Sequence, residues 1–178
     1  MFDELRRIDS NFSVDKFKGY IDNIFVQILS SIMKKKISGI KHFVSDDVFL
    51  EIEKRVTNLE NENLIQFYDE LNVSRTDILS INIEDDSIFI KVCILSKYMD
   101  YIIDENDHMV SGHNEFRIEK NYYLTFKRKK IIEKQKSARY CPRCGSNIDV
   151  NNNGMCDYCG AIYNLDDYDF ILCSMEVN

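Results

Sequence analysis

The chain has no tryptophan, one proline and three histidines among its 178 residues, and it has no long apolar run. A membrane-spanning helix needs about 20 mostly apolar residues, whereas the longest apolar stretch here is interrupted by polar residues at helical spacing. The chain also begins without the basic and then apolar segment of a secretory signal. We therefore expect a cytoplasmic protein with no transmembrane segment.

The short motifs of several enzyme classes are also missing. The sequence contains no glycine-rich phosphate loop, no Gly-x-Ser-x-Gly and no His-Glu-x-x-His. Its histidines are His42, His108 and His113, and the last two lie in a polar segment close to Asp104. A His–Asp pair acting as a base would also need a pocket that positions a substrate. A small enzyme with a polar pocket therefore stays an alternative, and solvated loop histidines are the more common situation.

Two Cys-x-x-Cys pairs, each followed by a glycine, are the strongest chemical signal in the chain: Cys141 with Cys144, and Cys156 with Cys159. Two intervening residues let both sulfurs of a tight turn face one ion, and glycine permits the positive φ of such a turn. Four thiolates suit one tetrahedral Zn²⁺ with no position open to water, which predicts a structural site. The same cage accepts iron, and disulfides are disfavoured in the expected cytosolic setting.

The net charge of −7 conceals a strongly basic segment. Residues 127–143 contain eight lysines and arginines against a single acid, Glu133. Such a run can bind nucleic acid or anionic lipid, but it is more often a solvated face or a linker. The chain after Arg143 is acidic, which favours internal pairing between the basic strand end and the cysteine-rich segment. Nucleic-acid binding through 127–143 is the second alternative function.

Apolar residues at helical spacing predict a long helix over 14–36 and a second helix over about 45–60. Ser13 and Ser45 are the predicted N-caps, since a serine side chain can accept a hydrogen bond from the first turn. The basic run 34–36 is expected in the last turn of the first helix, at the negative end of its dipole. The helix stripes must face a core.

Alternating apolar residues predict strands over 78–83, 87–104 and 116–128, and a continuous apolar segment predicts a last strand over 170–177. Short polar turns between the first three indicate an antiparallel meander, and helices followed by such a sheet make an α+β fold. The last strand follows the cysteine motif and is apolar on both faces, as a core strand would be. We therefore expect the cysteine-rich segment to be inserted between two neighbouring strands of the sheet.

Four stretches carry a resemblance to a known family: IDSNFSVDKF, MKKKISGIKHFVSDDVF, YMDYIIDENDHMVSGHNEFRIEKNYYLTFKR and DFILCSM. Over roughly residues 8–130 and 168–177 the chain resembles the Tim-44-like domain, in its bacterial branch. The resemblance implies a cone-shaped α+β fold of the cystatin and nuclear-transport-factor-2-like type, with helices packed on a curved antiparallel sheet. The family often has tryptophan where this chain has Tyr123 or Leu124 and Phe170, and these residues can fill the same core positions.

The resemblance and the cysteine motif together predict a Tim-44-like domain over 1–137 and 168–178 and a zinc ribbon over 138–167. The predicted function is a non-enzymatic binding or scaffold module with a structural Zn²⁺ held by the four cysteines. The resemblance implies a protein, peptide or lipid partner, which would bind at the concave face of the sheet. Because family members at mitochondrial membranes bind lipid or proteins, it also adds peripheral membrane association to the expected cytoplasmic location.

Overall fold

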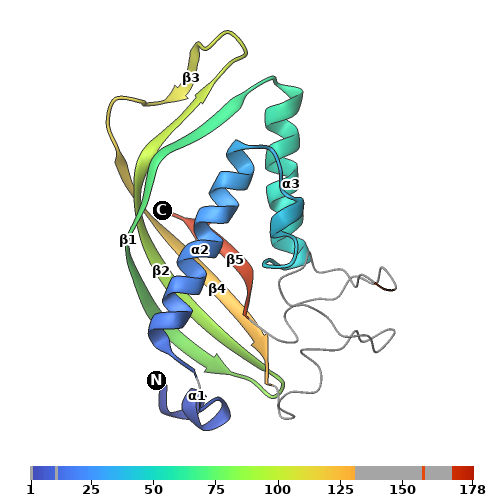
Figure 1. Ribbon diagram of the computed structural model, residues 1–178, viewed down its shortest axis with the longest axis vertical. Coiled ribbons are helices and arrows are strands. Elements are labelled where there is room, and N and C mark those ends of the chain that lie inside the picture. Colours follow the sequence, from blue (N-terminus) through green and yellow to red (C-terminus); the bar gives the residue numbers. More distant parts are fainter. Residues whose placement is uncertain (1, 11, 131–157, 159–169) are drawn as a thin grey trace.

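The computed structural model describes residues 2–10, 12–130, 158 and 170–178 (Figure 1). The four cysteines of the predicted metal site lie outside the described residues. So does the predicted ribbon, 138–167, apart from residue 158. The predicted division into a domain and a ribbon therefore stays a prediction.

Three α-helices and one short 3-10 helix come before the sheet: α1 (Phe2–Ile8), α2 (Val14–Met33), η1 (Ser38–Ile40) and α3 (Asp46–Asn61). Both predicted serine caps are present. The Ser13 hydroxyl accepts a hydrogen bond from the backbone N–H of Lys16, and the Ser45 hydroxyl accepts one from Val48. These bonds satisfy N–H groups that have no partner inside the helix.

The first long helix ends three residues before its predicted end. Lys34 is the C-cap of α2, and Lys35 has a φ of 53° in the left-handed region, which stops the helical pattern. The basic run 34–36 therefore follows the helix, and the prediction that it forms the last turn is wrong. None of these elements combines the length and apolar character needed to cross a membrane, as far as the described chain extends.

Five strands form one antiparallel sheet: β1 (Ile65–Ile83), β2 (Ser87–Ile103), β3 (Met109–Gly112), β4 (Ile118–Lys129) and β5 (Ile171–Val177). Their order is β1-β2-β4-β5, with β3 paired to β2 beyond the start of β4. The predicted α+β fold with an antiparallel sheet is confirmed. The strand β5 pairs directly with β4, so the chain between Lys129 and Ile171 connects two neighbouring strands.

The strand β1 is much longer than the predicted strand 78–83, and register shifts interrupt its pairing with β2. They fall between Asp69 and Asn72, between Val73 and Arg75, and between Ile78 and Ser80. Each extra residue moves the apolar positions out of simple alternation and increases the local bend of the strand. The sheet accordingly curves around the helices (Figure 1).

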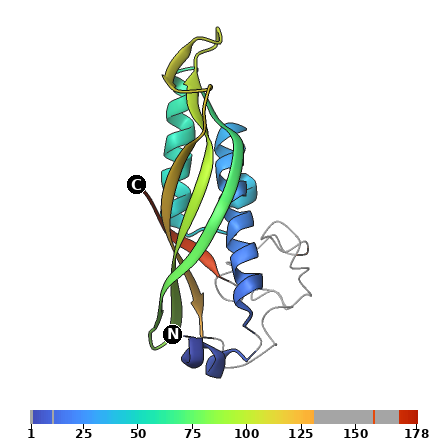
Figure 2. The same ribbon diagram turned by 90° about the vertical axis from the view of Figure 1, so that its left-hand side faces the viewer.

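The core lies between the helices and one face of the sheet. Both α2 and α3 lie on the same face of the sheet, and no helix of the described residues covers the opposite face (Figure 2). The residues Leu124 and Phe170, where the family often has tryptophan, are both buried. The predicted apolar stripe of α2 begins with Val14, which is half-buried, and the rest of it is buried: Phe17, Ile21, Ile24, Phe25, Ile28, Leu29 and Ile32.

The start of the predicted strand 116–128 differs from the prediction. Phe116 was expected to share a buried face with Leu124, but it precedes β4 and is 53 % exposed. The preceding polar segment, expected to be a loop, contains the short strand β3. Pairing with the end of β2 in a local hairpin makes this segment a strand, although the serine and the glycine at positions 111 and 112 do not favour one.

Candidate functional site

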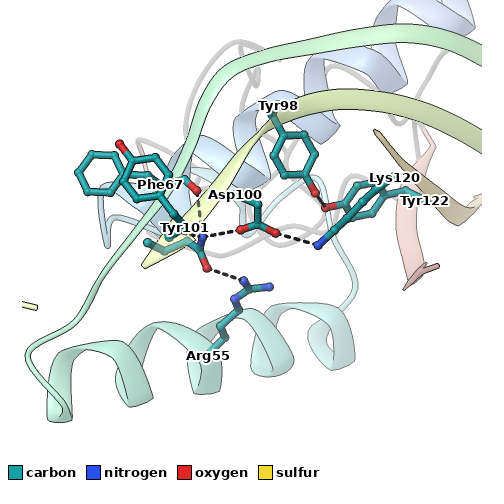
Figure 3. A network of polar contacts seen from close by, with 8 residues as sticks. Arg55, Phe67, Tyr98, Asp100, Tyr101, Lys120 and Tyr122 are labelled. Carbon is teal, nitrogen blue, oxygen red and sulfur yellow. Dashed lines mark hydrogen bonds and ion pairs between the residues drawn. The ribbon is translucent and has the colours of Figure 1, made fainter. Parts of the chain in front are cut away.

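The helix-facing side of the sheet carries a group of polar residues toward the end that holds β3. Alternation along β2 places Tyr98 and Asp100 on the same face as the buried Ile94. On β4, Lys120 and Tyr122 lie on that face as well. Because β2 lies between β1 and β4, these side chains meet across neighbouring strands (Figure 3).

Gln66 of β1 is the centre of this group and is almost completely buried, at 2 % exposure. Its side-chain amide nitrogen donates to the carbonyl of Phe67 over 2.9 Å, to the Asp100 carboxylate over 2.8 Å and to the carbonyl of Tyr101 over 3.1 Å. These acceptors determine which end of the amide faces the sheet. The amide oxygen is therefore turned toward α3, where it accepts a hydrogen bond from Arg55 over 2.9 Å.

Asp100 connects this amide to a lysine on the next strand. Its second carboxylate oxygen accepts from the ammonium of Lys120 over 2.7 Å. The two side chains are 21 % and 31 % exposed, so water reaches the pair from one side. The result is a continuous polar chain, Arg55–Gln66–Asp100–Lys120, that joins α3 to three strands (Figure 3).

Three tyrosines lie beside the polar chain Arg55–Gln66–Asp100–Lys120. The hydroxyls of Tyr98 and Tyr122 form a buried hydrogen bond, and the ring of Tyr68 contacts Tyr98 edge to face with centroids 5.5 Å apart. Burial raises the pKa of Tyr98, Tyr122 and Tyr68 above the usual value for tyrosine. All three hydroxyls are therefore neutral at physiological pH.

A pocket of about 390 Å³ opens between α3 and the start of β1, at the Arg55 end of the polar chain. Its volume is within the range of small ligand sites. Apolar side chains form part of its lining, namely Leu59, Leu64 and Ile102, and Gln66 also reaches it. Its charged lining residues are two acids, Glu51 and Glu62, and two bases, Lys54 and Arg55, so their formal charges cancel.

Arg55 is held at the edge of this pocket by neutral groups. Its guanidinium donates to Gln66 and lies over the ring of Tyr68, 5.8 Å from the centroid. Within the described part of the chain it forms no ion pair with a carboxylate. Because a guanidinium has five N–H donors, several remain for an external acceptor.

The histidines predicted as alternative catalytic groups do not line this pocket. His108 lies 3.2 Å from the Asp104 carboxylate, so the predicted His–Asp pair exists, but it is on the turn before β3 with the histidine side chain 78 % exposed. His113 stacks on Phe116 at the same end of the sheet. His42 contacts Phe43, and burial lowers its pKa.

The basic segment 127–143 is described only as far as Lys130. Arg128 donates to Asp9 over 2.9 Å and lies 4.6 Å from the centroid of Phe170, with its side chain 14 % exposed. Lys127 lies over the ring of Phe89. Arg128 thus makes an internal contact that ties β4 to the chain after α1.

The sequence analysis singled out none of Arg55, Gln66 and Asp100. Tyr98 packs in the core, and Asp100 joins three strands through its polar contacts. A signal was available in β4, where alternation puts Lys120 on the face of Tyr122. Nothing local distinguishes Gln66, because its partners are far away in the chain.

The metal motif cannot be placed against this site, since its cysteines fall outside the described residues. Elsewhere in the described chain, histidine, cysteine and acidic side chains form no group of three or more that would suit a metal ion. The other two cysteines, Cys93 and Cys173, are free thiols, and both are half-buried.

Comparison with known proteins agrees with this architecture. The Tim44-like domain matches residues 1–140, which include all the helices, β1 to β4 and every member of the polar chain. Among curated proteins, none matches the chain at a significant level. Since the family match covers well over half of the sequence, the chain belongs to the Tim44-like domain family.

Proposed function

We propose that this domain is a non-enzymatic binding module whose site is the pocket between α3 and β1. The observation that carries the proposal is the Arg55 guanidinium, which a buried amide holds beside an apolar pocket lining. Membership of the Tim44-like family favours a binding or scaffold role in general. The ligand we propose is a segment of a partner protein that carries a carboxylate next to an apolar side chain.

The carboxylate follows from the state of Arg55. Arginine binds carboxylates through parallel hydrogen bonds, and a guanidinium that is already oriented loses less side-chain entropy on binding. Gln66 provides that orientation, because its own amide is fixed by acceptors on β1 and β2. An incoming carboxylate would use the donors that Gln66 leaves free.

The apolar part of the ligand follows from the pocket lining. Leu59, Leu64 and Ile102 would bury an aliphatic or aromatic side chain next to the charged contact. A protein segment fits better than an anionic membrane surface, because the lining balances Glu51 and Glu62 with Lys54 and Arg55 and so lacks the excess of cations with which proteins bind anionic lipid. Lipid binding is therefore an outcome for the test to exclude.

The proposal is tested with a displayed library of random peptides, followed by affinity measurements on the enriched sequences. We expect enrichment of peptides with an acidic residue beside an apolar one, and about tenfold weaker binding by Arg55→Met. The control is Arg75→Met, since Arg75 is an exposed arginine of β1 paired with Asp77 outside the pocket. Melting curves verify that each variant is folded.

Either of two results would overturn the proposal. One is that no peptide binds the native chain more tightly than the Arg55→Met variant. The other is that vesicles of phosphatidylcholine and phosphatidylglycerol bind through Arg55 while the enriched peptides do not, which would make the ligand a lipid. Both measurements use the full chain.

The alternative functions have less support from the geometry. A catalytic base in the concave face would be Asp100, but its two oxygens are engaged by Gln66 and Lys120. The pair of His108 and Asp104 lies on an exposed turn away from the pocket. Nucleic-acid binding through 127–143 has less support because Arg128, one of the basic residues of that segment, forms an ion pair with Asp9.

We also propose that Cys141, Cys144, Cys156 and Cys159 hold one structural Zn²⁺ in a ribbon over 138–167, inserted in the domain formed by 1–137 and 168–178. The donor set fits the ion, since four thiolates complete a tetrahedral site. So short a segment buries too little apolar surface to fold alone, and metal binding would supply the missing stabilisation. The pairing of β5 with β4 supports an insertion between these strands.

Three finer features belong to the same proposal. The bend of the sheet around the helices supports the cone-shaped, nuclear-transport-factor-2-like fold. Membership of the bacterial branch of the family is supported by the resemblance of the four sequence stretches, since bacterial relatives are similar in carrying four cysteines at this point of the chain. We propose a cytoplasmic protein that reaches a membrane, if at all, through its protein partner.

A further inference from the structure

The end of the sheet that carries β3 has features that the pocket does not explain. The hairpin of β2 and β3 extends past the ends of the helices (Figure 1). Three large apolar side chains are exposed there: Met109 is 42 % exposed, Val110 54 % and Phe116 53 %. None of them belongs to the buried core. We refer to residues 104–117 as the tip.

We propose that the tip is a second interaction surface, at which a basic, extended segment of a partner protein adds as a strand beside β3. This proposal does not depend on the pocket between α3 and β1. It rests on three properties of the tip: an open strand edge, exposed apolar side chains on that strand, and acidic residues around it.

The open edge follows from the sheet topology. β3 pairs with β2 on one side, and β5 pairs with β4 only from Tyr122 onward. In the described chain no strand lies on the other side of β3. Alternate N–H and C=O groups of a paired strand point away from its partner, so β3 offers backbone groups to an incoming strand.

The edge is also held in a defined place. Gly112 at the end of β3 has a φ of 84°, and a Cβ there would lie 2.0 Å from the carbonyl oxygen of Asp100. At the other end the Asp104 carboxylate accepts hydrogen bonds from the backbone of Asn106 and His108 and orders the turn. An incoming strand would therefore meet a preformed edge, which lowers the entropy cost of binding.

The charge of the tip selects the partner. Four carboxylates surround the apolar side chains: Asp104, Glu105, Asp107 and Glu115. The tip has one lysine or arginine, Arg117, and it pairs with Glu70 of β1. A second copy that paired through its own tip would bring the same negative charge, and anionic lipid would be repelled for the same reason. A segment with alternating basic and apolar residues would satisfy both the carboxylates and the exposed apolar groups.

The test uses a synthetic peptide of alternating lysine and valine and the isotope-labelled full chain. We expect binding that slows amide hydrogen exchange in β3 and weakens with added salt. A peptide of alternating glutamate and valine should bind at least about tenfold more weakly. A lysine–valine peptide with proline at its centre should also bind weakly, because proline removes a strand hydrogen bond.

Variants separate the tip from the pocket. Val110→Asp should lose binding of the lysine peptide, and the double variant Glu105→Lys, Glu115→Lys should lose it while leaving the apolar residues in place. Val177→Asp is the matched control, since Val177 is equally exposed at the end of β5. Arg55→Met should bind the lysine peptide as the native chain does, so failure of the pocket proposal leaves this one standing.

The proposal is overturned if the glutamate peptide binds as well as the lysine peptide, or if no peptide affects exchange in β3. It is also overturned if neither Val110→Asp nor the double variant weakens binding. Binding of phosphatidylglycerol vesicles that Val110→Asp abolishes would assign the tip to a membrane instead. Loss of binding in the double variant cannot be explained by misfolding, because both glutamates are exposed and their replacement leaves the core unchanged.

Discussion

The buried side-chain amide of Gln66 on β1 donates a hydrogen bond to the Asp100 carboxylate on β2 over 2.8 Å. The amide oxygen accepts from Arg55 on α3, so one uncharged side chain connects a cation to an anion that do not touch each other. A buried amide whose hydrogen bonds are all formed stabilises the fold. If the amide is removed, its former partners are left without a hydrogen bond in a poorly hydrated place, which lowers the free energy of unfolding.

Replacing this amide should therefore destabilise the domain. We expect Gln66→Leu to lower the free energy of unfolding by about 1–3 kcal/mol, because Asp100 loses a donor and Arg55 loses its acceptor. Urea unfolding measures the change. Asn72→Leu on the same strand is the control, since Asn72 is exposed and its side chain only approaches Ser74, and it should change stability by less than about 0.5 kcal/mol. Equal effects of the two variants would contradict the role of Gln66.

The hydrogen bond between Tyr98 and Tyr122 should appear as a coupling between two substitutions. Tyr98→Phe leaves the buried hydroxyl of Tyr122 without its partner, so a loss of about 1–3 kcal/mol is expected, and Tyr122→Phe should behave in the same way. The double variant removes both hydroxyls and should cost at least about 0.5 kcal/mol less than the two single losses combined. Additive losses would show that the hydroxyls do not interact.

Stability should fall at alkaline pH. Burial raises the pKa of Tyr98 and Tyr122, so both stay protonated in the folded chain while an unfolded tyrosine loses its proton near pH 10. The unfolded state then binds fewer protons, and the free energy of unfolding decreases as the pH rises above about 10. Denaturant titrations at pH 8, 10 and 11 measure the slope. The double Tyr98→Phe, Tyr122→Phe variant should have a shallower slope, and an unchanged slope would contradict this cause.

Two glycines should respond to alanine in opposite directions. Gly112→Ala puts a Cβ against the Asp100 carbonyl at positive φ, and we expect a loss of about 2 kcal/mol or more, with faster hydrogen exchange in β3. Gly19 lies in α2 with nothing near its missing Cβ, so Gly19→Ala should stabilise the chain by roughly 0.5–1 kcal/mol. Thermal unfolding compares the two. An unchanged rate of amide hydrogen exchange in β3 of Gly112→Ala would show that the close approach of Gly112 to the Asp100 carbonyl is not required.

The proposed metal site has a direct test. Cys144→Ser should lower the bound metal measured by mass spectrometry, since three thiolates hold the ion less well than four, while the far-ultraviolet circular dichroism of the helices is kept. Cys93→Ser is the control, because Cys93 is a half-buried thiol of β2. A full metal equivalent in Cys144→Ser would disprove the assignment, and the same measurement distinguishes zinc from iron.

Local chemistry in the sequence was sufficient to predict much of the fold. The two serine caps, the buried stripe of α2 and the alternation of β2 are properties of short segments, and each was found where it was expected. Residues 65–77 of β1 were not predicted because two register shifts there break the two-residue period. The strand β3 was missed because its sequence alone does not favour a strand.

The candidate site divides in the same way. The sequence by itself determined that Lys120 and Tyr122 share a face of β4, and its four cysteines, by their spacing, predict a metal site that stays a prediction. Only the tertiary structure decided that Gln66 contacts Asp100 and that Arg55 is connected to Asp100 through Gln66. The physical reason is that burial and strand register set which polar groups lie within hydrogen-bond distance, and register joins residues more than thirty positions apart.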